Sequence, residues 1–149
     1  MAIAGIGNTL AEANLNLDQG SGSPATWYFG LLTTMPTDGD ATSLVEAAWS
    51  GYARPSLTNN TTNFPNASVV VHIAQITCQG AIAWGTLPGG AATQVVAGLA
   101  ECTALSASYT GGNMGRTAVF GTIASPVTYT LNAGASLSIP AGNLVLQQT

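Results

Sequence analysis

Basic side chains are almost absent from this sequence, which contains no lysine and only two arginines among its 149 residues. Charged residues of either sign make up 5% of the chain, against about 25% in an ordinary globular domain. Two arginines cannot follow a phosphate backbone or form a polybasic segment that binds a membrane. No apolar run approaches the roughly 18 residues that a membrane-spanning helix needs. We therefore expect neither nucleic acid nor a membrane as a partner.

The shortage of charge also determines what the surface can be made of. Hydrophobic residues make up 46% of the chain, so we expect a folded core, and the length suits one domain. The surface must then consist mainly of Thr, Ser, Asn, Gln, Gly and Ala, which protect a free monomer poorly against self-association. We expect copies of the same chain, or a larger assembly, to cover much of this surface.

Motifs for catalysis and metal binding are missing as well. The chain has two cysteines, Cys78 and Cys102, and one histidine, His72, at spacings that fit no zinc site. No P-loop, GxSxG, HExxH or CxxC motif occurs. The sequence therefore predicts no enzyme activity, no cofactor and no metal.

The N-terminus bears on the redox state of the cysteines. It lacks the basic region of a signal peptide, so we expect synthesis in the cytoplasm. A reducing compartment favours two buried thiols at Cys78 and Cys102. A disulfide that forms late, or across an interface, stays open as the alternative.

The N-terminal residues predict a short helix followed by a flexible joint. A capping box, TLAE, starts at Thr9, and Leu10 and Leu17 fall on one face of the helix that follows. The glycine-rich segment GSGSP then interrupts the pattern. We expect residues 1–23 to form an arm, which either packs on the body of the same chain or reaches into an assembly.

Residues 27–54 read as a strand, a polar loop and a returning strand. The loop contains Asp38, Asp40 and Glu46, which are half of the acidic residues, and the returning strand contains Arg54. The loop does not fit the EF-hand pattern, because the glycine and the final glutamate are misplaced. A charged side chain in an apolar body needs a partner. We expect Arg54 to pair with Glu46 or with one of the two aspartates, and so to act as a structural pin for the loop.

The rest of the chain predicts an all-β fold. Strand-like runs punctuated by Gly, Pro and Asn recur about every 8–12 residues, which indicates a jelly-roll-like β-sandwich over residues 24–149. Residues 69–78 are apolar at nearly every position and predict one central strand buried on both faces. Residues 93–99 and 101–109 predict two further strands, with a break at Ala100.

Several short motifs follow one another in an order that is similar to a known family. They are WYFGLLTTMPTD at residues 27–38, SGYAR at 50–54, AWG at 83–85, TGGN at 110–113 and LNAGASLSIPAGNLVL at 131–146. Together they resemble a family of small virion proteins of tailed bacteriophages, over about residues 26–147. That family is commonly described as tail fibre, and similar jelly-roll proteins decorate or cement capsids. The longer hairpin region at residues 86–108 departs from the usual pattern of the family.

The resemblance implies a structural protein of the virion. Our first hypothesis is a decoration or cement protein on the capsid surface, a homo-oligomer and most simply a homotrimer, bound across subunits of the phage major capsid protein. Contacts spread over such junctions add up to useful stabilisation of the shell. The candidate docking residues lie in the arm, in the polar loop and just after it; they are Leu10, Leu17, Pro36, Asp38, Asp40 and Trp49.

The alternative hypothesis is a tail-fibre or tail-tip adhesin domain that binds the host surface. Its candidate contacts are aromatic, and at least two of them are expected to pack in the core instead. These residues are Trp27, Trp49, Tyr52 and Trp84.

Overall fold

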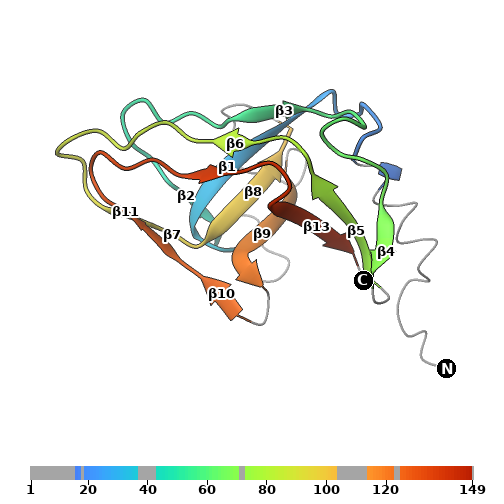
Figure 1. The fold of residues 1–149 in the computed structure, drawn as a ribbon. Coiled ribbons are helices and arrows are strands. Elements are labelled where there is room, and N and C mark those ends of the chain that lie inside the picture. Colours follow the sequence, from blue (N-terminus) through green and yellow to red (C-terminus); the bar gives the residue numbers. More distant parts are fainter. Residues whose placement is uncertain are drawn as a thin grey trace. The chain divides into compact units, whose positions relative to one another are not determined.

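A computed structural model describes residues 16–17, 19–36, 43–70, 73–103, 114–122 and 125–148 of the chain. Over these residues the regular structure is almost entirely β-strand, with helical conformation at Asn16, Leu17 and Ser43 (Figure 1). The expectation of an all-β protein is therefore confirmed. The rest of the predicted N-terminal helix, including Leu10, lies outside the described residues.

Contacts divide the chain into two compact units, and each unit is assembled from separate stretches of sequence. Unit 1 consists of Met1–Thr26, Leu57–Ala81 and Ile139–Thr149, and unit 2 consists of Trp27–Ser56 and Ile82–Ser138. The predicted division into an arm of residues 1–23 and a body of residues 24–149 stays a prediction, because most of the arm lies outside the described part.

The largest sheet belongs mainly to unit 2, and its strand order is β10–β9–β8–β1–β2, with β3 also paired to β1. Its strands are β1 (Thr26–Thr34), β2 (Val45–Glu46), β3 (Ser56–Thr58), β8 (Gly98–Cys102), β9 (Met114–Thr122) and β10 (Ser125–Val127). β1 pairs antiparallel with β2 and β8, and β9 pairs antiparallel with β8 and β10. β1 and β8 therefore lie in the interior of the sheet.

Large side chains of these two strands form the core of unit 2. Phe29 and Leu31 lie on one face of β1, and Leu31 is opposite Leu99 of β8. All three side chains are buried. Burial of a side chain of this size contributes about 1.5–3 kcal/mol. β8 is buried along its whole length and runs through Ala100, so the predicted strand break at Ala100 is wrong.

Two short pairs of strands in the second half of the chain are formed by the same two chain segments. β6 (Ile82–Ala83) pairs with β12 (Ser138–Ile139), and β7 (Gln94–Val96) pairs antiparallel with β11 (Tyr129–Leu131). Between the two pairs the Leu87 N–H donates to the Ala135 carbonyl at 2.8 Å. The chain therefore passes back alongside itself as a two-stranded ribbon.

Unit 1 contains a three-stranded antiparallel sheet. Its order is β13–β5–β4, with β4 (Ser68–Val70), β5 (Ile73–Cys78) and β13 (Leu144–Gln148). Val70 is the cross-strand partner of Ile73, so the chain reverses direction between them. The prediction of one continuous strand over residues 69–78 is therefore wrong. His72 falls at this reversal and lies outside the described residues.

The glycine-rich segment at the end of the arm is attached to a buried asparagine. The Gly20 N–H donates to Oδ1 of Asn59, and the Asn59 N–H donates to the Ala25 carbonyl at 3.0 Å. Asn59 and Phe64 are both buried, and both lie in the loop between β3 and β4. The segment that the sequence presents as a flexible joint is thus tied to the loop at two points.

We predict that Gly20→Ala destabilises the protein more than Gly51→Ala does. Both glycines have positive φ angles, +76° and +83°, a region that costs an L-residue about 1–2 kcal/mol. At Gly20 an added Cβ would also lie 2.5 Å from the Phe64 carbonyl oxygen, whereas at Gly51 it would meet nothing within 4 Å. Free energies of unfolding from denaturant titration measure the difference.

Gly89→Ala is the matched control, because an added Cβ there meets nothing within 4 Å and the φ angle is ordinary. This variant should change the free energy of unfolding by less than about 0.5 kcal/mol. Equal losses for Gly20→Ala and Gly51→Ala would contradict the close approach of Phe64 to Gly20.

Candidate functional site

A polar network inside unit 2 gathers most of the chain's described charge. Glu46 closes β2, where the chain returns from the polar loop, and Leu32 of β1 is its cross-strand partner. Arg54 lies in the segment that precedes β3. A turn leads into this segment: the Tyr52 N–H donates to the Trp49 carbonyl at 3.0 Å, and Gly51 has a positive φ. Tyr52 and Arg54 follow this turn, two positions apart on one extended segment, and both side chains contact Glu46.

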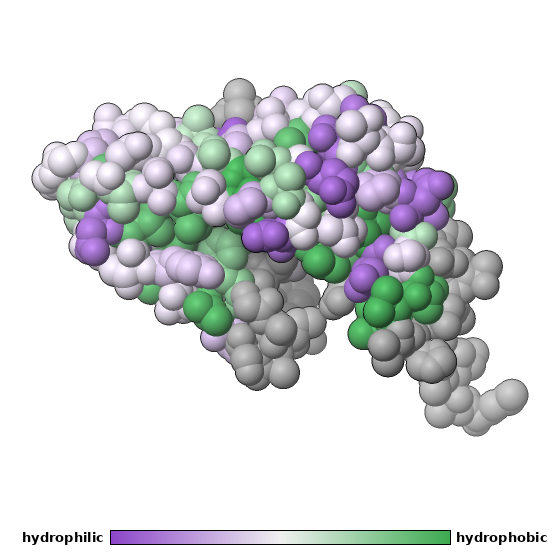
Figure 2. All heavy atoms as spheres, in the orientation of Figure 1, coloured by the Kyte–Doolittle hydropathy of each residue, from purple (hydrophilic) through white to green (hydrophobic). Residues whose placement is uncertain are grey.

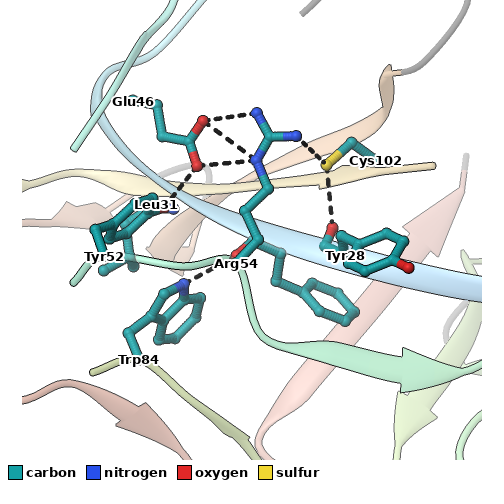
Figure 3. A network of polar contacts seen from close by, with 8 residues as sticks. Tyr28, Leu31, Glu46, Tyr52, Arg54, Trp84 and Cys102 are labelled. Carbon is teal, nitrogen blue, oxygen red and sulfur yellow. Dashed lines mark hydrogen bonds and ion pairs between the residues drawn. The ribbon is translucent and has the colours of Figure 1, made fainter. Parts of the chain in front are cut away.

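Arg54 and Glu46 form a forked ion pair (Figure 3). Nη2 of Arg54 lies 2.7 Å from Oε2 of Glu46, and Nε lies 3.0 Å from Oε1 and 3.3 Å from Oε2. The two side chains are 5% and 18% exposed. Withdrawing two charges from water is costly, and a bidentate contact with further hydrogen bonds is the arrangement that offsets this cost.

Further hydrogen bonds connect the pair to two strands of the sheet. The Tyr52 hydroxyl donates to Oε1 of Glu46 at 2.6 Å and accepts from the Leu31 N–H of β1 at 2.8 Å. On the other side, Nη1 of Arg54 donates to Sγ of Cys102, at 3.3 Å. The Cys102 thiol lies 3.4 Å from the Tyr28 carbonyl, to which it can donate (Figure 3). β1, β2 and β8 are therefore linked through a single guanidinium–carboxylate pair.

The chemistry that this arrangement supports is structural. The guanidinium and the carboxylate are occupied by each other, and Cys102, like Cys78, is buried and does not form a disulfide. Among the described residues, no three His, Cys, Asp or Glu side chains gather as metal ligands. No helix in the described part is long and apolar enough to cross a membrane. What the network can do is hold the end of the polar loop against β1 and β8.

Three of the other predicted site residues, Leu17, Pro36 and Trp49, lie within the described part of the chain. Pro36 is half-buried, and Leu17 is 70% exposed. Trp49 is half-buried and packs edge-on against Tyr52, with ring centroids 4.6 Å apart. Leu10, Asp38 and Asp40 lie outside the described residues, so their docking role stays a prediction.

Two of the aromatic residues proposed as host contacts are core residues. Trp27 is 5% exposed and Trp84 is 3% exposed. Nε1 of Trp84 donates to the Phe29 carbonyl at 2.9 Å. This agrees with the expectation that at least two of the four pack inside, and it removes both residues as surface contacts.

Glu101 is a buried acid to which the sequence analysis gave no role. It is 1% exposed near the C-terminal end of β8, and its cross-strand partners are Phe29 of β1 and Arg116 of β9. A carboxylate in this position must be compensated, because burying it alone is very costly. The signal in the sequence was a single glutamate in the small apolar run GLAEC. It was missed because the predicted strand break at Ala100 placed Glu101 at a strand end.

We predict that Arg54→Ala lowers the free energy of unfolding by about 3–5 kcal/mol, because Glu46 is then left without its cation in a largely buried place. Tyr52→Phe keeps the ring against Trp49 but leaves the Leu31 N–H without its acceptor, and should cost about 1–3 kcal/mol. Denaturant unfolding monitored by tryptophan fluorescence measures both.

The double variant Arg54→Met with Glu46→Gln is the control for the ion pair. Because it removes both charges, its loss in the free energy of unfolding should be clearly smaller than the sum of the losses for Arg54→Met alone and Glu46→Gln alone. Additive losses, or an unchanged melting temperature for Arg54→Ala, would contradict the pinning role of the pair.

Comparison with known families identifies the chain. The family model described as "Podophage GP4 fiber I protein gp80" matches residues 5–147, nearly the whole sequence. No curated protein matches the chain. The match includes the strand–loop–strand stretch of residues 27–54 and the later motifs up to residue 146. It confirms the resemblance to tail-fibre-like virion proteins. The chain therefore belongs to this podophage fibre protein family and is a structural component of a phage virion.

Proposed function

We propose that the protein is a self-associating subunit of a podophage tail fibre. The observation that carries this proposal is the family match, whose description names a fibre protein and which spans residues 5–147. A fibre subunit places the chain at the tail of the virion and at the host surface. This favours the adhesin alternative of the sequence analysis over the capsid hypothesis.

The structure supports a mechanical role in which the chain is a building block. The regular secondary structure of the described residues is almost entirely β-strand, and the charged network links β1, β2 and β8. The proposal includes a homo-oligomer, most simply a trimer, with no enzyme activity, no cofactor and no nucleic-acid or membrane partner. A jelly-roll-like sandwich with a short N-terminal helix is the finer fold that we propose for the subunit.

A second candidate function is the capsid decoration or cement protein. It is supported by the compact length of 149 residues without a repeat of the kind that builds a long shaft, and by a composition with only 5% charged residues. In this role Pro36 and Trp49, both half-buried, would dock across subunits of the major capsid protein at the capsid surface.

We predict that gold-labelled antibodies against the chain decorate the tail of purified virions. Quantitative mass spectrometry of the same virions should find far fewer copies of the chain than of the major capsid protein. The labelling control is an antibody against the major capsid protein, which should mark the shell. Label over the whole shell, with a copy number comparable to that of the major capsid protein, would overturn the fibre proposal and support the cement function.

A further inference from the structure

The end of the N-terminal arm is bound to a loop within unit 1. We call four described residues of the arm the strap; they are Asn16, Leu17, Gln19 and Gly20. The loop is the connection between β3 and β4, residues 59–67 (Figure 1). Oδ1 of Asn16 accepts a hydrogen bond from the Ala67 N–H at 2.8 Å. At the other end of the strap, the Gly20 N–H donates to Oδ1 of Asn59. The strap is therefore attached to both ends of the loop.

Loop 59–67 offers the strap a well-packed acceptor. Asparagine occupies four of its nine positions, so it can bond backbone groups through side-chain amides, and Figure 2 shows hydrophilic side chains where β3 leads toward β4. Oδ1 of Asn60 accepts two backbone N–H groups of the loop itself. Asn59 and Gln19 are each 2% exposed. At Gly20 an added Cβ would lie 2.5 Å from the Phe64 carbonyl oxygen, so the two backbones touch.

Four residues connect the strap to the rest of the chain. We call them the hinge; they are Ser21, Gly22, Ser23 and Pro24. The first three are exposed, and the Ser21 hydroxyl bonds within the hinge, to the Ser23 backbone at 3.2 Å. The residue after the hinge is fixed, because the Ala25 carbonyl accepts from the Asn59 N–H at 3.0 Å. Asn59 therefore binds the chain on both sides of the hinge.

This double attachment makes the hinge turn back on itself within one chain. Gly20 and Gly22 have φ angles of +76° and +79°, which suit a tight bend, and glycine also adopts extended conformations readily. In a fully extended hinge, Gly20 could lie as far as about 17 Å from Ala25. The same four residues can thus return the strap to its own loop or carry it to the loop of an adjacent molecule.

A second copy of this chain is the partner that the strap fits. The contact depends on a backbone N–H aimed at Asn59 and on the absence of a Cβ at Gly20, and an identical chain supplies the identical loop. Exchange leaves one strap on every loop, so neither the contacts nor the charge of this region change. Exchange of an identical element is a low-cost route to an oligomer, and short hinges favour it.

We propose that copies of the chain exchange their straps, so that the strap of one copy binds loop 59–67 of the next. Each copy gives its strap to one neighbour and receives another, and the exchange closes into a ring, most simply of three copies. The short hinge requires the loops of neighbouring copies to lie near their common interface. The inference rests on the proposed self-association and names the element that carries it.

The test is a pair of cysteines, Asn16→Cys and Ala67→Cys, where the strap meets the loop. The hydrogen bond between the Asn16 side chain and the Ala67 backbone brings the two positions close enough for a disulfide. With both substitutions in one chain, oxidation should give covalent oligomers on a non-reducing gel, because each disulfide then joins two copies. A disulfide within a single chain, at monomer mass, would overturn the exchange.

The controls separate strap exchange from other oxidation. Cys78 and Cys102 are buried and form no disulfide, so each single variant should stay at the monomer mass. Ser68→Cys with Gln75→Cys is the matched pair, because these residues are cross-strand partners in β4 and β5. This pair should form its disulfide within one chain whether or not straps are exchanged.

The length of the hinge provides a test without cross-linking. Six Gly and Ser residues inserted after Ser21 let the strap return to its own loop without a tight bend. They should weaken self-association about tenfold or more, as judged by sedimentation equilibrium. The same insertion between the exposed Gly89 and Gly90 of unit 2 is the control and should leave self-association unchanged.

The outcomes distinguish exchange from self-association itself. If the wild type is a monomer at every concentration, both proposals fail. If it associates while the hinge insertion has no effect, or while the paired cysteines close within one chain, only strap exchange fails.

Discussion

The ion pair between Arg54 and Glu46 is the contact on which the sheet of unit 2 depends. β2 has only two residues, too few to stay attached to β1 by backbone hydrogen bonds alone. The forked contact joins Glu46 to the segment before β3, and Tyr52 and Cys102 extend the connection to β1 and β8. The end of the polar loop is therefore fixed by side chains from three places in the sequence. Because both charges are largely removed from water, the arrangement tolerates the loss of neither partner alone.

Burial of the described charged side chains leaves the described surface with little charge. Glu46, Arg54 and Glu101 are the charged residues whose side chains are described, and Arg54 and Glu101 are buried while Glu46 is half-buried. The described surface is consequently almost free of charge and is covered by neutral polar and β-branched side chains. Such a surface lacks the repulsion that keeps most proteins apart in solution. This is a liability in a free monomer, and it suits a subunit that is covered by its own copies in a virion.

Sequence periodicity and turn residues were enough to predict an all-β chain, and scarcity of cations was enough to give Arg54 an acidic partner. The partner's identity could be narrowed only to Asp38, Asp40 or Glu46, because the choice depends on the register that sets Glu46 opposite Leu32. The reversal between Val70 and Ile73 was invisible, because no Gly, Pro, Asn or Asp marks it. Leu17 was expected on the apolar side of a helix, yet it is 70% exposed, and its neighbour Asn16 accepts a hydrogen bond from the distant Ala67 N–H, a contact that no local pattern contains.

Within its described part, the chain uses its charged side chains to fix its own fold, and we propose that its neutral surfaces meet other copies of the chain. The most direct measurement is the mass of the purified wild-type chain by sedimentation equilibrium, over a range of protein and sodium chloride concentrations. Charge-free contacts predict an oligomer whose mass is unchanged or raised by salt, because there is no attraction between opposite charges for salt to screen. A monomer at every concentration, or an oligomer that dissociates as salt is added, would contradict the account.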